Sequence, residues 1–114
     1  MNSNQTFRIR FENATTAEAN QRASELREIL LDITPDVSVE VIKEDQSTQD
    51  FGSTLVLVLG APAIIVIEKG IADYLSRLGG SITIEDKSGK VIAKGIQSKD
   101  AARIAEAFSQ KNKR

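Results

Sequence analysis

Residues 51–67 read F-G-S-T-L-V-L-V-L-G-A-P-A-I-I-V-I and contain no charged side chain, although 27% of the whole chain is charged. The run is shorter than the about 20 apolar residues that a helix needs to cross a bilayer. Gly60 and Pro62 also interrupt it near its middle. An element that is apolar on all sides needs cover on all sides. We therefore expect this run to be a core element or a docking surface for a partner.

The first part of the run, residues 55–59, is open to two interpretations. It is the buried first half of one long kinked helix, with Asp50 or Ser53 as the N-cap, or it is a buried strand that ends at Gly60. In the second case Pro62 lies in the first turn of a following helix. The β-branched valines favour the strand, whereas the capping residues favour the helix. Periodicity does not separate these two structures, so both interpretations stand.

The second part of the run leads into a helix. Its apolar residues recur at spacings of three and four, while charged residues recur every four positions on another face. Gly79-Gly80 is expected to end this helix, because glycine accepts the left-handed conformation of a helix cap. The apolar positions of the expected helix are Ile64, Ile67, Ile71, Tyr74 and Leu78.

The segment before the run predicts a strand, a helix and a second strand. Residues 7–11 alternate apolar and charged side chains, which is typical of a strand with one buried face. Residues 15–18, T-T-A-E, form a capping box that begins a helix extending to about residue 31. Residues 34–36, T-P-D, end this helix, and residues 37–41 alternate as the next strand. This order predicts a right-handed parallel crossover.

The segment after the run predicts a β-hairpin and a last helix. Residues 81–85 alternate as a strand, and D-K-S-G at 86–89 is typical of a turn into a return strand over 91–93. Ser98 is expected to cap the last helix, and the basic residues 110–114 are expected to fray.

These elements predict a single α+β domain over residues 1–114. Its architecture is a two-layer sandwich, with a four- to five-stranded mixed sheet covered on one face by helices. The other face of the sheet is predicted to be polar, either as an ordinary solvated surface or as a recognition surface. The residues of that face that would contact a ligand or partner are Arg8, Arg10, Glu40 and Glu85.

Composition excludes several classes of function. The chain has no histidine and no cysteine, which removes imidazole bases, thiol nucleophiles, thiolate zinc sites and disulfides. Its 15 basic and 16 acidic residues nearly balance, so no overall field attracts nucleic acid. The acidic pairs at 44–45 and 85–86 lack the spacing of a calcium loop. We therefore predict no enzymatic activity, no cofactor and no metal.

The start of the chain predicts where the protein resides. Residues 1–10, M-N-S-N-Q-T-F-R-I-R, contain no apolar core behind a basic segment, so we expect no signal peptide. The absence of cysteine is consistent with a cytoplasmic protein.

The order of these features resembles the effector-associated constant component proteins of bacteria. The resemblance covers nearly the whole chain and lies in four segments: F-R-I-R-F at 7–11, S-E-L-R-E-I-L at 24–30, D-V-S-V-E-V at 36–41 and L-V-L-V-L-G-A-P-A-I-I-V-I-E-K-G-I-A-D-Y-L at 55–75. The hairpin I-T-I-E-D-K-S-G-K-V-I at 82–92 and the short last helix follow in the same order. Pro62 stands where that family usually has glycine or alanine.

The resemblance implies a non-enzymatic adaptor or scaffold of a bacterial conflict, or anti-phage, system. Its expected partners are a protein effector such as a peptidase, an NTP-dependent regulator, or a second copy of the chain. The alternative is a membrane-acting component that inserts residues 51–67 into a bilayer on activation. The interaction surface is predicted to comprise Leu55, Leu57, Leu59, Ile64, Ile65, Ile67 and Ile71.

Overall fold

The computed structural model describes residues 5–34, 37–43 and 53–109. The predicted N-cap Asp50 and the predicted frayed tail at 110–114 lie outside these residues. The elements follow one another as β1 (Gln5–Phe11), α1 (Thr16–Ile33), β2 (Ser38–Lys43), β3 (Ser53–Leu59), the 3-10 turn η1 (Ala61–Ala63), α2 (Ile64–Leu78), β4 (Ile82–Asp86), β5 (Val91–Ile96), the 3-10 turn η2 (Ser98–Asp100) and α3 (Ala101–Ser109).

The described strands form one five-stranded sheet in the spatial order β2-β3-β1-β4-β5. Each adjacent pair is antiparallel, so the prediction of a mixed sheet is wrong in this respect. β1 and β2 run parallel to each other, but β3 lies between them. β3 and β4 also run parallel to each other, and β1 lies between them. The sheet therefore contains two interleaved split β-α-β units, which is the ferredoxin-like arrangement, extended by β5 and α3.

The uncharged run contains both a strand and the start of a helix. Residues 55–59 belong to β3, so the long-helix alternative is wrong. β3 pairs with β1 on one side and with β2 on the other. A strand that is paired along both edges satisfies its backbone groups within the sheet, and its leucines then face the helices. Pro62 lies in η1, immediately before α2.

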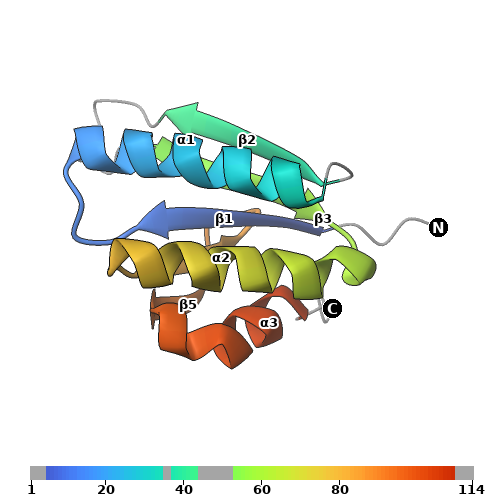
Figure 1. Cartoon of the computed structure of the whole chain (residues 1–114). Helices are drawn as coiled ribbons and strands as arrows, with labels where there is room; N and C mark the ends of the chain where they lie inside the picture. Colours follow the sequence, from blue (N-terminus) through green and yellow to red (C-terminus); the bar gives the residue numbers. More distant parts are fainter. Residues whose placement is uncertain (1–4, 35–36, 44–52, 110–114) are drawn as a thin grey trace.

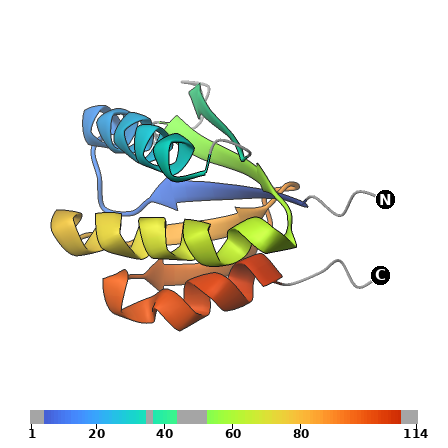
Figure 2. The same cartoon turned by 45° about the vertical axis from the view of Figure 1, so that its right-hand side comes forward.

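α1, α2 and α3 all lie on one face of the sheet, as predicted (Figures 1 and 2). The core lies between the two layers, where alternate residues of β1 and β3 meet the buried faces of the helices. The rings of Phe7 on β1 and Phe108 on α3 are 4.9 Å apart between centroids and tilted by 59°. Because Phe108 is only 1% exposed, the last helix is part of this core. The α+β sandwich is therefore confirmed.

The ends of the helices follow the predicted signals with one exception. The Thr15 hydroxyl accepts from the Glu18 backbone N–H at 3.0 Å, and the Glu18 carboxylate accepts from the Thr15 N–H at 3.0 Å. Gly79 closes α2 in the left-handed conformation with φ 77°. Ser98, however, is not the cap of the last helix: it begins η2, and Asp100 accepts from the Gln97 N–H. The Asp100 side chain is longer than that of serine and reaches the backbone N–H of Gln97 from within η2.

The β4–β5 hairpin is confirmed. Asp86 Oδ1 accepts from the backbone N–H groups of Ser88 and Lys90 and from the Ser88 hydroxyl, while Gly89 has φ 93°. These hydrogen bonds hold the pKa of Asp86 below its usual value. The pairing shifts register twice along β5, so this edge strand is irregular, whereas β2 at the opposite edge keeps one register throughout.

Candidate docking surface

The structure separates the residues of the predicted interaction surface into two groups. Ile65, in the first turn of α2, is 68% exposed, and Ile64 is half-buried. The other five are 3% exposed or less and belong to the core, so a partner cannot reach them while the domain is folded. They are Leu55, Leu57, Leu59, Ile67 and Ile71.

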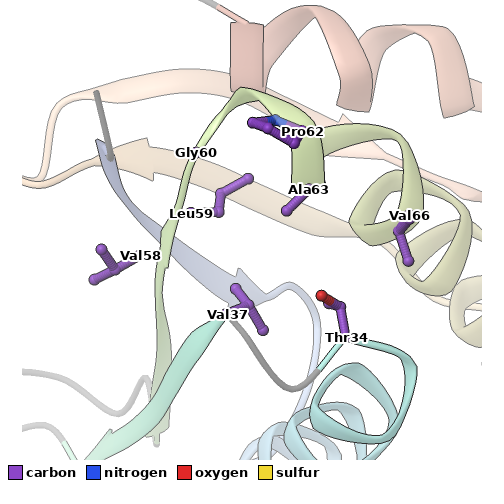
Figure 3. Close-up of a pocket in the computed structure, with 8 residues that line it drawn as sticks. All are labelled: Thr34, Val37, Val58, Leu59, Gly60, Pro62, Ala63 and Val66. Atoms are coloured by element: carbon purple, nitrogen blue, oxygen red, sulfur yellow. The ribbon is translucent and has the colours of Figure 1, made fainter. Parts of the chain in front are cut away.

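A pocket lies at the end of the domain where α1 stops and α2 starts (Figure 3). Its volume is about 360 Å³. Figure 3 shows the side chains of Val37, Leu59, Ala63 and Val66 around one space, with Thr34 at its edge. The lining residues are Thr34, Val37, Val58, Leu59, Gly60, Pro62, Ala63 and Val66.

Exposed apolar side chains adjoin this pocket. Val66 lines the pocket and is 36% exposed, and Ile33, at the end of α1, is 43% exposed. A Cβ added at Gly70 would lie 2.9 Å from the Ile33 Cδ1 atom, so Ile33 packs against α2 at Gly70. Gly70 is one helical turn after Val66. We call Ile33, Ile65, Val66 and the pocket walls the apolar end patch.

The walls of the pocket in the apolar end patch are almost entirely apolar. None of the residues that line the pocket is ionisable, and Thr34 supplies the only side-chain hydroxyl among them. α2 begins without a side-chain cap, because Ala63 occupies the N-cap position. Such walls accommodate an apolar side chain and offer few polar contacts; they provide no acid, base or nucleophile.

One polar contact joins α1 to α2 behind the patch. The Tyr74 hydroxyl donates to Glu25 Oε1 at 2.7 Å, and the tyrosine is 6% exposed. Burial, followed by this hydrogen bond to a carboxylate, raises the pKa of Tyr74. The same hydrogen bond, followed by one from Gln21, lowers the pKa of Glu25. The contact fixes the two helices relative to each other.

The predicted polar face of the sheet is the face opposite the helices. Phe7, Ile9 and Phe11 of β1 face the core, so the alternation of the strand places Arg8 and Arg10 on this open face. Arg10 Nε donates to Glu85 Oε2 at 3.0 Å, and Glu85 is only 7% exposed.

The other two predicted residues of the open face, Arg8 and Glu40, are not brought together. They lie on β1 and β2 on either side of Val56 of β3, and neither forms an ion pair with a described residue.

Glu12 has a structural role at the end of β1. Its carboxylate accepts from the hydroxyls of Ser81, at 2.8 Å, and Thr83, and from the backbone N–H of Gly95 at 2.9 Å. Burial opposes ionisation, but these hydrogen bonds outweigh it and the pKa of Glu12 is lowered. Gly95 has φ 64°, which belongs to the irregular part of β5. Glu12 thereby ties β1 to β4 and β5.

Comparison with known proteins identifies no relative: no family model, no curated protein and no solved structure matches the chain. Within residues 5–34, 37–43 and 53–109, no group of acidic side chains is arranged to hold a metal ion. None of the helices in these ranges combines the length and apolar character needed to cross a bilayer. Insertion of residues 51–67 would further require β3 to leave its place between β1 and β2.

Most residues of the apolar end patch were not among the predicted interaction residues. Ile33, Thr34, Val37 and Val66 come from three separate segments, and the fold brings them together. One signal was available: Ile65 and Val66 both interrupt the three- and four-residue spacing of the apolar face of α2. An apolar residue off the buried stripe of a helix is exposed unless another element covers it.

Proposed function

We propose that this protein is a non-enzymatic protein-interaction module whose apolar end patch docks a protein partner. One observation carries the proposal: Val66 lines an apolar pocket and is 36% exposed, and Ile65 beside it in the sequence is 68% exposed. The leucines of β3 in the same run fill the core instead. A large exposed apolar side chain at the rim of an apolar pocket is typical of an interaction site.

The size and composition of the patch suit a short segment of a partner protein. The pocket, at about 360 Å³, has room for an apolar side chain, and Val66 in its wall is partly exposed. Ile33 and Ile65, each next to a lining residue in the sequence, add exposed apolar surface. Removing apolar surface from water contributes about 25 cal/mol per Å². Side chains that fill such a pocket contribute much of the affinity of a protein interface. The partner is expected to present an apolar anchor.

The resemblance to the effector-associated constant component family supports a specific kind of partner. It suggests an adaptor or scaffold in the cytoplasm that couples an effector, such as a peptidase, to an NTP-dependent regulator in a bacterial defence system. The described residues contain no histidine or cysteine and no metal-ligand cluster, which is consistent with a role in binding.

Affinity purification after expression with the chromosomal neighbours tests this function. The wild-type chain is expected to recover a peptidase or NTPase in stoichiometric amount. Ile65→Asp and Val66→Asp are expected to lose that partner, because each places a charge in the docking surface. Val91→Asp is the matched control, since Val91 is 46% exposed but lies on β5, away from the patch.

The fold of each variant is checked by circular dichroism. Recovery of the partner by folded Ile65→Asp and Val66→Asp, at the wild-type level, would contradict the proposed docking surface. Loss of the partner from Val91→Asp alone would place the interface on the other side of the molecule.

A further inference from the structure

The two outer strands of the sheet differ in regularity. The pairing of β5 shifts register twice, and the Gly95 N–H donates to the Glu12 side chain at 2.9 Å. Arg103 of α3 also donates to the Lys94 carbonyl of β5 at 3.1 Å. Irregular pairing and side chains on the backbone keep a further strand from joining such an edge. β2, at the opposite edge, keeps one register with β3 along its whole length.

The hydrogen-bond pattern of the sheet shows which backbone groups of β2 face outward. In an antiparallel pair, both backbone groups of a residue point to the same neighbouring strand, and successive residues alternate. The Glu12 N–H donates to the Ser81 carbonyl at 3.0 Å, so even-numbered residues of β1 bond to β4 and odd-numbered ones bond to β3. The registers pair odd with odd and even with even residues, so β3 and β2 bond through their even-numbered residues. The N–H and C=O groups of Val39 and Val41 therefore point to the free edge.

A side-chain contact agrees with this assignment. Arg27 of α1 donates through Nε to the Val39 carbonyl at 3.1 Å, which places that carbonyl within reach of a group outside the sheet. A carbonyl oxygen has a second lone pair, so it can accept another donor. Within residues 5–34, 37–43 and 53–109, no other hydrogen bond reaches the outward groups of Val39 and Val41. The edge thus presents backbone groups with the spacing of an extended strand.

The side chains along this edge indicate what a further strand would carry. Val39 is buried and Val41 is half-buried on the helix side of the sheet, whereas Glu40 is exposed and Ile42 is 46% exposed on the other side. Residues directly opposite each other in an antiparallel pair share a face and interact. Apolar residues therefore suit the positions opposite the valines and Ile42, and a basic residue suits the position opposite Glu40.

A second copy of the chain does not supply that basic residue. If β2 paired with β2 of another copy, the same-face residue opposite Glu40 would be Ser38, Glu40 or Ile42. Glu40 forms no ion pair with a described residue of its own chain. Its charge is therefore matched only by a strand of a different sequence.

We infer that the outer edge of β2 accepts an extended segment of a partner protein as an added antiparallel strand, with apolar residues beside Val39 and Val41 and a basic residue beside Glu40. Main-chain hydrogen bonds provide affinity in this mode of binding, and alternate side chains provide specificity. The added strand ends beside the start of β2, next to Val37 in the pocket wall. The inference deepens the proposed function and rests on it for the identity of the partner.

A synthetic peptide, capped at both ends and with the order Thr, Ile, Val, Lys, Val, Thr, tests the edge without the natural partner. Hydrogen exchange of individual amides is followed by NMR with and without about 5 mM peptide. In the free protein, the N–H groups of Val39 and Val41 are expected to exchange quickly, whereas those of Glu40 and Ile42 are slow because they bond to β3. The peptide is expected to slow Val39 and Val41, with a dissociation constant on the order of 1 mM.

Two modified peptides separate strand addition from other binding. N-methylation of the third peptide residue removes the N–H that is donated to the Val41 carbonyl, so binding should be lost. N-methylation of the fourth residue is the matched control, because that N–H points away from β2. Glu40→Lys is expected to weaken the lysine peptide about three- to tenfold, and a peptide with Glu in place of Lys should regain the loss.

Four results would overturn the inference. They are slow exchange of Val39 and Val41 in the dilute free protein, no protection of these amides at about 5 mM peptide, equal effects of the two N-methyl groups, and protection that appears with protein concentration alone. The last result would show that a second copy occupies the edge.

Val66→Asp distinguishes this inference from the proposed function. The variant is expected to bind the peptide as the wild type does and to lose the partner in affinity purification. If it loses the partner and the peptide fails to protect β2, only the added strand is wrong. If it keeps the partner while the peptide protects β2, only docking at the apolar end patch is wrong.

Discussion

The leucines of β3 and the isoleucine at position 65 belong to the same uncharged run but occupy opposite environments. Leu55, Leu57 and Leu59 of β3 are 3% exposed or less, whereas Ile65 at the start of α2 is 68% exposed. The first half is a strand inside the sheet with helices over it, and the second half begins a helix at the end of the domain. Apolar character in one continuous run therefore has two consequences: it builds the core in β3 and leaves exposed apolar surface at the start of α2.

Truncation in each half should separate these roles most strongly. Leu57→Ala is expected to lower the free energy of unfolding by about 2 to 5 kcal/mol, because it leaves a cavity between the sheet and the helices. Ile65→Ala is expected to change it by less than about 0.5 kcal/mol, since that side chain is mostly in water. Urea unfolding followed by circular dichroism measures both. Equal losses of unfolding free energy in the two variants would show that Ile65 also contributes to the stability of the fold.

Gly70 allows a test of how closely α1 approaches the exposed half. A Cβ at this position would lie 2.9 Å from Ile33 Cδ1 and 3.0 Å from Leu30 Cδ2. Gly70→Leu is expected to cost about 1 to 3 kcal/mol by overpacking, and to move Ile33 at the edge of the patch. Gly70→Ala is the milder control, because its methyl group meets only the ends of flexible side chains and alanine favours the helix. Thermal unfolding of both variants would show whether Gly70→Leu is less stable than Gly70→Ala, as expected.

The Tyr74–Glu25 hydrogen bond should have a smaller effect. Tyr74→Phe removes the donor and keeps the ring, so we expect a loss of about 1 kcal/mol at neutral pH. Glu25 is solvent-accessible and water replaces the lost donor, which limits the cost. A loss of more than about 3 kcal/mol in urea unfolding would indicate that the tyrosine holds α1 and α2 together in another way.

The smallest expected effects on stability come from two ionised carboxylates, and low pH removes them. The folded-state pKa values of Glu12 and Glu25 are lowered from 4.5, so these carboxylates stabilise the fold above pH 4.5, and this contribution is lost as the pH falls through their folded-state values. The difference between wild type and Tyr74→Phe should therefore shrink on acidification below pH 4.5. Unfolding at several pH values measures this difference in free energy. If the difference grew in acid, the pKa of Glu25 would be raised, not lowered, by the hydrogen bond.

Local patterns in the sequence predicted most elements of the fold. The alternation of residues 7–11, the capping box at Thr15 and the glycines at 79 and 89 each act within a few residues, and the structure confirms them. The placement of β3 between β1 and β2 could not be predicted in this way, because it depends on pairing between distant segments. The crossover alone predicts a mixed sheet, because the local pattern does not show that β3 lies between β1 and β2.

The candidate site was harder to predict than the fold. Leu57 and Ile65 look alike in a hydropathy profile, and only the tertiary structure shows that one is covered and the other is not. Val37 and Thr34 join the patch because α1 ends beside the start of α2. The charged residues predicted for the second face of the sheet do lie opposite the helices, although Val56, Val58 and Ile42 share that face. The sequence did not show that Arg10 pairs with Glu85 while Arg8 and Glu40 remain apart.

Hydrogen–deuterium exchange on the affinity-purified complex and on the free protein tests the central claim most directly. The account predicts that amides of 61–66 and of the end of α1 become protected in the complex, while those of β3 are already slow in the free protein. Rapid exchange of β3 in the free protein, or protection on binding that excludes the start of α2, would contradict the division of this run into a core strand and a docking surface.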